Sequence, residues 1–263
     1  MKKIALMKMM MILCAVVFMA ASCKREDPTP EDPDTPAYRG DRIPDAVTDF
    51  DGNIYDAVKI GNQIWMAENL RTTHFANGDT IPVGTVSSSS DPYRYLPNNN
   101  DSLVPEYGYL YNWSAAMHNA SASEANPSGV QGVCPDGWHL PSNAEWVEME
   151  SVVAGKDMSA DGWRGEHAGL LAGGEQGTWV AVNTPGAPGD YRNTDRNSSL
   201  FSVLPAGNYS DGSDRFGEIA SFWSTSTFHE VMVWMRTLYA DNSSVLYGPY
   251  NGRMGLSVRC VKN

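Results

Sequence analysis

The feature that most constrains this chain is an uncharged apolar run near its N-terminus, which ends in small residues and a cysteine. The run covers Met9 to Ala21, about 13 residues, and three lysines precede it. A helix needs about 20 residues to cross a bilayer, so the run predicts a cleaved secretory signal and not a membrane span. We therefore expect the rest of the chain to fold in an oxidising compartment, where disulfides form and persist.

The residues at the predicted cleavage point resemble the lipobox of bacterial lipoproteins. Ala20, Ala21 and Ser22 are small and stand directly before Cys23. In a lipobox the chain is cut before the cysteine and the thiol is acylated. We expect residues 1–22 to be removed and the lipid on Cys23 to attach the protein to the membrane. An ordinary secreted protein with an unmodified Cys23 is the alternative.

The segment after Cys23 is rich in proline and acidic residues and has no apolar face to pack. In extended polyproline geometry, residues 24–37 would span roughly 40 Å. We assign residues 23–48 to a lipidated tether and residues 49–263 to one folded domain. Acidic residues close behind a lipidated cysteine also resemble the surface-export signals of Bacteroidetes lipoproteins, although Lys24 and Arg25 depart from that pattern. The expected location is the cell envelope, as an outer-membrane lipoprotein that this signal would display on the surface.

The cysteine content predicts one disulfide. With Cys14 in the signal and Cys23 lipidated, Cys134 and Cys260 are the two left for the folded domain. In an oxidising compartment, an even pair without further ligands at short spacing is more typical of a disulfide than of a metal site. Such a bond would stabilise the fold by about 4–5 kcal/mol in the chain-entropy description.

The charge balance argues against nucleic-acid binding. Removal of residues 1–22 takes away three lysines and no acid, which leaves 16 basic and 31 acidic side chains and a formal charge of −15. Phosphate backbones need a basic patch, and beyond Lys24 and Arg25 the processed chain has no such cluster.

From Asp49 onward, short apolar alternations and turn residues predict an α+β domain with short antiparallel strands, few helices and long irregular loops. Residues 54–60, a Gly61-Asn62 turn and residues 63–66 predict a β-hairpin. Ser142 and Glu145 have capping-box spacing, which predicts a helix beginning at Ser142. Further predicted elements are strands at 107–111, 201–204, 231–238, 245–247 and 256–261, a short helix at 113–117, and surface loops at 87–102 and 183–199.

Five segments together resemble one family. They are DGNIYDAVKIGNQIWMAENLR (51–71), YGYLYNWSAAM (107–117), GVCPDGWHLPSNAEW (132–146), AGNYSDGSDRFGEIASFWSTST (206–227) and SVRCVKN (257–263). The chain looks like the Fibrobacter succinogenes major paralogous domain, which is common in secreted and lipid-anchored proteins of Fibrobacter and Bacteroidetes. The match runs in the expected order over nearly the whole predicted domain.

The resemblance implies a C-type lectin-like fold, in the branch that contains the sulfatase-modifying, formylglycine-generating enzymes. In such folds a disulfide commonly ties the terminal strand to the chain near the first helices, which agrees with a Cys134–Cys260 bond. The catalytic function does not carry over, because those enzymes need two close cysteines near the C-terminus and this chain has only Cys260 there. The Glu-Pro-Asn or Gln-Pro-Asp and Trp-Asn-Asp motifs of calcium-dependent sugar-binding lectins are also missing.

No catalytic residue, metal site or cofactor is predicted. The five histidines lack the spacing of a zinc site, and we expect His139 to make structural hydrogen bonds just before the helix. Asp211 and Asp214 could supply oxygen ligands to calcium, but the sequence around them favours an Asp-Gly turn in solvent.

Two of the eight tryptophans are the candidate ligand contacts. Trp163 and Trp179 flank a glycine-rich stretch that could present their rings, which suit both sugar stacking and protein interfaces. Buried anchoring of that stretch is the competing interpretation. Framework segments hold five others, for which core packing is expected: Trp65, Trp113, Trp138, Trp146 and Trp223.

These observations favour a non-enzymatic, lipid-anchored binding or interaction domain. Its expected ligand is a polysaccharide or another envelope protein, which rests on fold and location. A structural or adhesin-like assembly component is the alternative. An enzyme would require a cleft with perturbed carboxylates or a free thiol.

Overall fold

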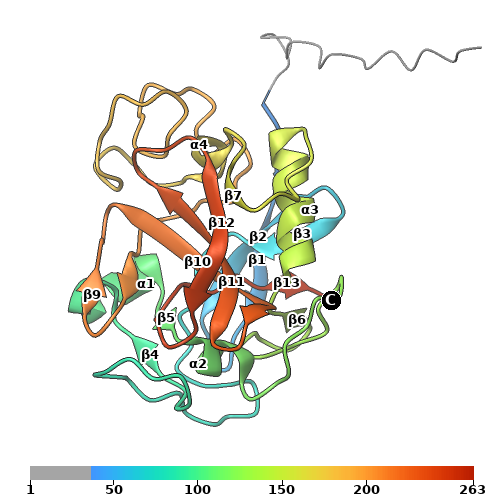
Figure 1. Cartoon of the computed structure of the whole chain (residues 1–263), viewed down its shortest axis with the longest axis vertical. Helices are drawn as coiled ribbons and strands as arrows, with labels where there is room; N and C mark the ends of the chain where they lie inside the picture. The colour runs from blue at the N-terminus through green and yellow to red at the C-terminus, as the bar shows by residue number, and fades with distance from the viewer. Residues whose placement is uncertain (1–36) are drawn as a thin grey trace, which may run out of the picture. The chain divides into compact units, whose positions relative to one another are not determined.

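Antiparallel strand pairing organises the chain from Asp41 to its last strand at Val261–Lys262 (Figure 1). The computed structural model describes residues 37–263. The predicted signal peptide, Cys23 and most of the predicted tether lie outside the described residues. Within residues 37–263, no helix combines the length and the apolar composition that a membrane crossing requires.

The first sheet joins the beginning of the domain to its end. Its strand order is β1-β2-β3-β13-β6, and every pairing is antiparallel. Its strands are β1 (Asp41–Thr48), β2 (Ile54–Ile60), β3 (Gln63–Met66), β6 (Trp138–His139) and β13 (Val261–Lys262). Because β13 pairs with both β3 and β6, the last residues of the chain hold two earlier segments together.

The hairpin predicted at residues 54–66 is confirmed with its boundaries. Val58 pairs with Trp65 and Ile60 with Gln63 across the Gly61-Asn62 turn. Gly61 has a φ of +59°, the left-handed region that the first residue of such a turn needs and that glycine adopts at little cost.

The predicted tether is too long at its C-terminal end. Residues 41–48, which we assigned to it, form β1, and the compact unit begins at Ala37. This strand was missed because it is an edge strand with mostly exposed side chains. Its alternation is also interrupted, since Pro44 lies inside it and Asp45 has a φ of +49° at a shift in register.

The second sheet has the order β10-β11-β12-β7 and is also antiparallel. Its strands are β10 (Ile219–His229), β11 (Met232–Tyr239), β12 (Val245–Asn251) and β7 (Gly162–Arg164). Two small ribbons complete the strands: β4 (Arg94–Tyr95) with β5 (Leu110–Tyr111), and β8 (Asn208–Tyr209) with β9 (Ser213–Asp214). The predicted strand at 201–204 is wrong, because these residues lie in loop structure with one isolated bridge at Val203.

Four short to medium α-helices occur in the described residues. They are α1 (Val104–Tyr107), α2 (Trp113–Met117), α3 (Asn143–Ala154) and α4 (Ala168–Leu171), with 3-10 turns at Pro97–Asn99 and Asp101–Leu103. The helix at 113–117 is confirmed, whereas α1 takes Tyr107 from the predicted strand and leaves only Leu110–Tyr111 extended.

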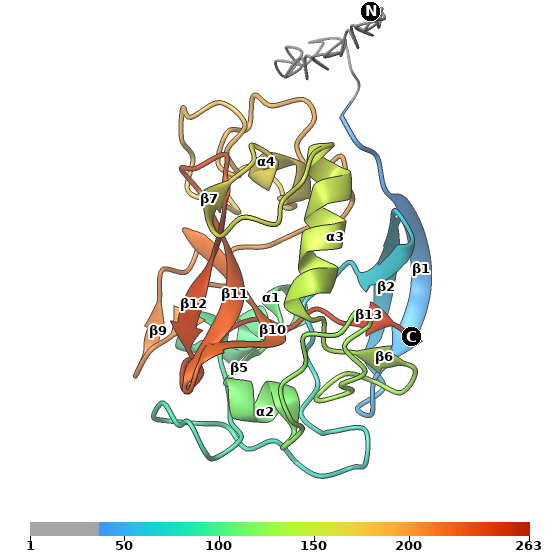
Figure 2. The same cartoon turned by 45° about the vertical axis from the view of Figure 1, so that its right-hand side comes forward.

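The capping box predicts the start of α3 correctly. The Ser142 hydroxyl accepts from the Glu145 N–H, and the Glu145 carboxylate accepts from the Ser142 N–H at 2.9 Å. Helix α3 lies between the two sheets (Figure 2). The Trp146 ring packs on Trp65 of β3 at 4.7 Å and on Phe222 of β10 at 5.6 Å between ring centroids. A tryptophan of this size therefore joins both sheets into one core.

Candidate functional site

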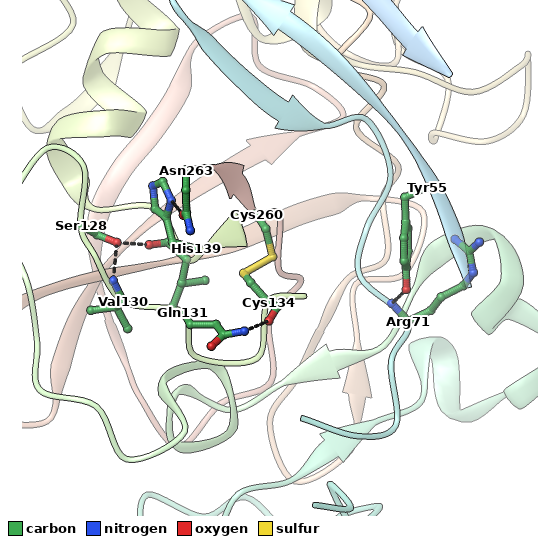
Figure 3. Close-up of a disulfide and its surroundings, with 10 residues drawn as sticks. Tyr55, Arg71, Ser128, Val130, Gln131, Cys134, His139, Cys260 and Asn263 are labelled. Carbon is green, nitrogen blue, oxygen red and sulfur yellow. Dashed lines mark hydrogen bonds between the residues drawn. A yellow bond between two sulfur atoms is a disulfide. The ribbon is translucent and has the colours of Figure 1, made fainter. Parts of the chain in front are cut away.

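The predicted disulfide is present. Cys134 and Cys260 are bonded, with their Cα atoms 5.9 Å apart (Figure 3). The bond ties the loop before β6 to the residue before β13. Both cysteines of the described residues are therefore consumed, which leaves no free thiol in residues 37–263 for nucleophilic or metal chemistry.

His139 has the structural role that we expected. Its Nε2 lies 2.6 Å from Glu145 Oε1 and its Nδ1 lies 2.7 Å from Asn263 Oδ1. Burial of the ring opposes protonation, but the hydrogen bond and the charge of Glu145 raise its pKa above the ordinary value. The side chain thus joins α3 to the residue after β13, and both of its nitrogens are occupied.

Trp179 is wrong as a ligand contact. It is 1 % exposed, and its indole N–H donates to the Gly173 carbonyl at 3.1 Å. It packs in the core cluster of α3, α4 and the second sheet. Burying an aromatic ring of this size stabilises the fold strongly, so the glycine-rich loop is anchored inward by Trp179 and does not present it.

Trp163 is the tryptophan that the structure leaves accessible. It lies on the edge strand β7 and is 50 % exposed. It pairs with Leu246 of β12, which pairs with Thr237 of β11. Side chains alternate between the two faces of a sheet, so Tyr239 shares the face of Thr237 and Trp163. The rings of Trp163 and Tyr239 are in contact, with centroids 5.0 Å apart.

We call the surface formed by Trp163, Tyr239, Leu246 and Tyr250 the aromatic face. Trp163 is the most exposed member, and the other three are partly buried. Their side chains are therefore accessible to solvent but restrained by their neighbours. The Tyr250 hydroxyl accepts a hydrogen bond from Asn208 Nδ2 at 3.2 Å. Partial burial and the neighbouring Tyr239 and Asp214 raise the pKa of Tyr250, so its hydroxyl stays protonated at neutral pH.

Polar side chains border the aromatic face. The Arg215 guanidinium lies over the Tyr239 ring at 4.9 Å, and its Nε donates to Glu218 Oε2 at 3.2 Å. The aromatic face thus combines two rings in contact, tilted by 57° to one another, with charged and hydroxyl groups at their edge.

The opposite side of the same strands contains a buried ionic cluster. Arg164, the neighbour of Trp163, donates to Glu150 of α3, and Arg236 of β11 donates to the same carboxylate at 2.6 Å. Both guanidinium groups also lie over the Tyr247 ring, at 4.4 and 4.0 Å. Burial lowers the pKa of Arg236 to about 10, which leaves it charged at neutral pH. This cluster fixes β7 to α3.

His167 lies beside this cluster without a hydrogen bond. Its Nε2 is 3.9 Å from Glu150 Oε2, and neither ring nitrogen makes a hydrogen bond to the described residues. Burial is the main cause that lowers its pKa to about 4. The charge of Glu150 raises the pKa, and the charge of Arg164 lowers it. The ring is therefore neutral at neutral pH.

A hollow of about 380 Å³ lies elsewhere, between the turn after β1 and α1. Its wall includes Asp51, Arg71 and Tyr109. Asp51 accepts from Thr73 and faces His74 Nδ1 at 2.5 Å, while Arg71 donates to Glu68 at 2.8 Å. Since these charged groups are already paired with one another, the hollow offers less to a ligand than the aromatic face.

Asp211 is engaged by the chain itself, and Asp214 lies in a short strand. Asp211 Oδ1 accepts from the Ser87 N–H at 2.9 Å, and Asp214 ends the short strand β9. No group of three or more histidine, cysteine or acidic residues that could hold a metal ion occurs within residues 37–263.

Tyr239, Tyr250 and Arg215 were not predicted as members of this site. The predicted strands at 231–238 and 245–247 end before the two tyrosines, whereas β11 and β12 continue through them. The two faces of these strands also look alike in sequence, because both contain aromatic residues. Only the register between β7, β12 and β11 places them beside Trp163.

In a comparison with family models, residues 58–262 match the model of the Fibrobacter succinogenes major domain. The chain belongs to this family. The matched range includes the disulfide, α3 and all of the aromatic face. It begins inside β2, so β1 of this Fibrobacter succinogenes major domain lies before the matched range. No curated protein and no solved structure matches the chain.

Proposed function

We propose that this protein is a non-enzymatic, lipid-anchored envelope protein that binds a glycan through its aromatic face. The observation that carries the proposal is the half-exposed Trp163 in ring contact with Tyr239, next to the charged edge formed by Arg215 and Glu218. The rings offer apolar surface for the C–H face of a sugar, and the edge offers hydrogen bonds for its hydroxyls.

The envelope location belongs to the same proposal. Its support is the apolar run before Cys23 and the acidic, proline-rich segment after it. An outer-membrane anchor at Cys23 would place the domain where polysaccharides occur.

We also propose that the domain has a C-type lectin-like fold, related to the sulfatase-modifying enzymes. In support, the first strands and the last strand share one sheet, and the Cys134–Cys260 bond secures the terminal strand. The catalytic cysteine pair of those enzymes has no counterpart, because Cys260 is bonded to Cys134.

The test is a glycan array probed with the full-length protein, with and without calcium. We expect Trp163→Ala to weaken binding by on the order of tenfold, since an aromatic contact contributes about 0.5–1.5 kcal/mol beyond its buried area. Phe228→Ala is the matched control, because Phe228 is 55 % exposed near the end of β10 and its ring contacts Trp234, which lies on the opposite face of β11 from Tyr239. Binding that depends on Phe228 and not on Trp163 would place the site elsewhere.

An adhesin-like or assembly role is the second candidate. It is favoured by the end of the β10–β11 hairpin, where Phe228 of β10 and Val231 of the turn are both more than half exposed. The Phe228 ring contacts the Trp234 ring, with centroids 4.8 Å apart. Exposed apolar groups at a hairpin turn are typical of protein contacts. An array without any binding, together with self-association that Phe228→Ala abolishes, would favour this role.

A further inference from the structure

We infer that the aromatic face binds an uncharged polysaccharide and discriminates against carboxylated or sulfated ones. This inference rests on the proposed function and adds the chemical class of its ligand. It comes from the charges that surround the aromatic face, which are mainly negative.

Acidic residues without a pairing partner lie close in sequence to the residues that carry the rings. Asp161 lies two residues before Trp163 and Glu166 three residues after it, and Asp241 lies two residues after Tyr239. All three are exposed. Asp214, also exposed, is close enough to Tyr250 to raise its pKa. Within residues 37–263 these four carboxylates have no side-chain hydrogen bond or ion pair, so their charges are not compensated by a neighbour.

All but one of the positive charges nearby are paired with an acid or lie on the other face of the sheet. Arg215 is bonded to Glu218, and Arg253 lies near Asp211, whose pKa it lowers. Arg164 and Arg236 point away from the aromatic face and share the buried Glu150. Arg253 is exposed and makes no ion pair within residues 37–263, so a ligand on the aromatic face meets four unpaired acids against one unpaired base.

A polyanionic chain on this surface would be repelled by each unpaired carboxylate. A single interaction between exposed charges is weak in water, but four act in the same direction on every acidic sugar of the chain. A neutral polymer is not repelled by the carboxylates, so its affinity is not reduced and it still contacts the rings. The acidic composition of the processed chain, with a formal charge of −15, adds a repulsive field of longer range.

The experiment compares neutral polymers with carboxylated polymers of the corresponding sugars. Full-length protein would be titrated by calorimetry with β-glucan, galactan and mannan, and in parallel with polyglucuronate, polygalacturonate and polymannuronate. We expect at least one neutral polymer to bind, and its carboxylated counterpart to bind about threefold to tenfold more weakly at about 0.01 M salt. This gap should narrow at about 1 M salt, because the screening length falls from about 30 Å to about 3 Å.

Charge variants make the result specific to the aromatic face. The double substitution of Asp161→Asn and Asp241→Asn should strengthen binding of the carboxylated polymer and leave the neutral one unchanged. Asp136→Asn with Glu230→Gln is the matched control, since these exposed acids lie in the loop before β6 and at the β10–β11 turn. Equal or tighter binding of the carboxylated polymers by the unaltered protein would overturn the inference but keep the proposed glycan binding. Binding of none of the six polymers or of any arrayed glycan would overturn both.

Discussion

Trp163 and Arg164 are consecutive residues of β7 whose side chains lie on opposite faces of the second sheet. Trp163 is half exposed on the aromatic face, whereas Arg164 is buried and donates to Glu150 of α3. The period of two in a strand makes this separation obligatory. The ionic cluster therefore fixes β7 on the face that packs against α3. The position of β7 in turn determines where the Trp163 ring lies on the opposite face.

The first prediction concerns the carboxylate of this cluster. Glu150→Gln should destabilise the protein by about 3–5 kcal/mol, because it leaves two buried guanidinium groups without their counter-charge. Urea unfolding followed by fluorescence measures this change. Glu218→Gln removes an exposed ion pair with Arg215 and should change the free energy of unfolding by less than about 1 kcal/mol. Equal effects of the two substitutions would show that the buried cluster contributes no more than a surface pair.

The second prediction separates the two tryptophans. Trp179→Ala should lower the free energy of unfolding by about 3–5 kcal/mol, since it removes a fully buried ring and leaves a cavity. Trp163→Ala should change it by less than about 1 kcal/mol, because half of that ring is already in water. Thermal unfolding of both variants checks the contrast. A large loss of stability in Trp163→Ala would mean that its ring serves packing more than binding.

The third prediction follows from the buried His167. Its folded pKa of about 4 lies below the unfolded value of 6.5, so between these pH values only the unfolded chain binds the proton. The stabilisation from the neutral ring is complete above pH 6.5 and is lost progressively toward pH 4, by about 3 kcal/mol in total. Denaturant unfolding from pH 7 to pH 4 measures the loss.

The comparison variant for this pH effect is His167→Leu, which cannot titrate. The difference between the unaltered protein and this variant isolates the histidine from the carboxylates and from His139, whose raised pKa acts in the opposite direction. Parallel pH profiles of the two proteins would contradict the prediction.

The fourth prediction concerns the disulfide. Replacing Cys134 and Cys260 together by alanine should cost about 4–5 kcal/mol, because the bond closes a loop between residues 126 positions apart. Mass spectrometry after thiol alkylation under denaturing conditions should find neither cysteine modified in the unaltered protein. Quantitative alkylation of both residues would refute the bond.

The local elements were predicted where a few neighbouring residues determine the backbone. The Gly61-Asn62 turn fixes the first hairpin, and the Ser142 and Glu145 side chains fix the start of α3, so both appear in the structure at the predicted residues. Elements whose neighbours are distant in sequence were missed. β1 is stabilised by pairing with β2 and not by its own sequence pattern. In the segment 201–204, the apolar Phe201 packs on Trp65 and Trp146 from a loop and does not belong to a strand.

By itself, the sequence determined the family, the disulfide and the general α+β character of this protein. Motifs and turn residues determine the backbone near them, and the cysteine count leaves a single pair that can bond. Only the tertiary structure decided which tryptophan faces solvent. Trp163 and Trp179 flank the same glycine-rich stretch and have equal intrinsic preferences for burial. The register of β7 against β12 places the Trp163 ring on the exposed face of the sheet. The Trp179 ring packs in the core, where its indole N–H donates to the Gly173 carbonyl. Exposure of a side chain depends on contacts between distant segments, and a pattern read along the chain does not contain them.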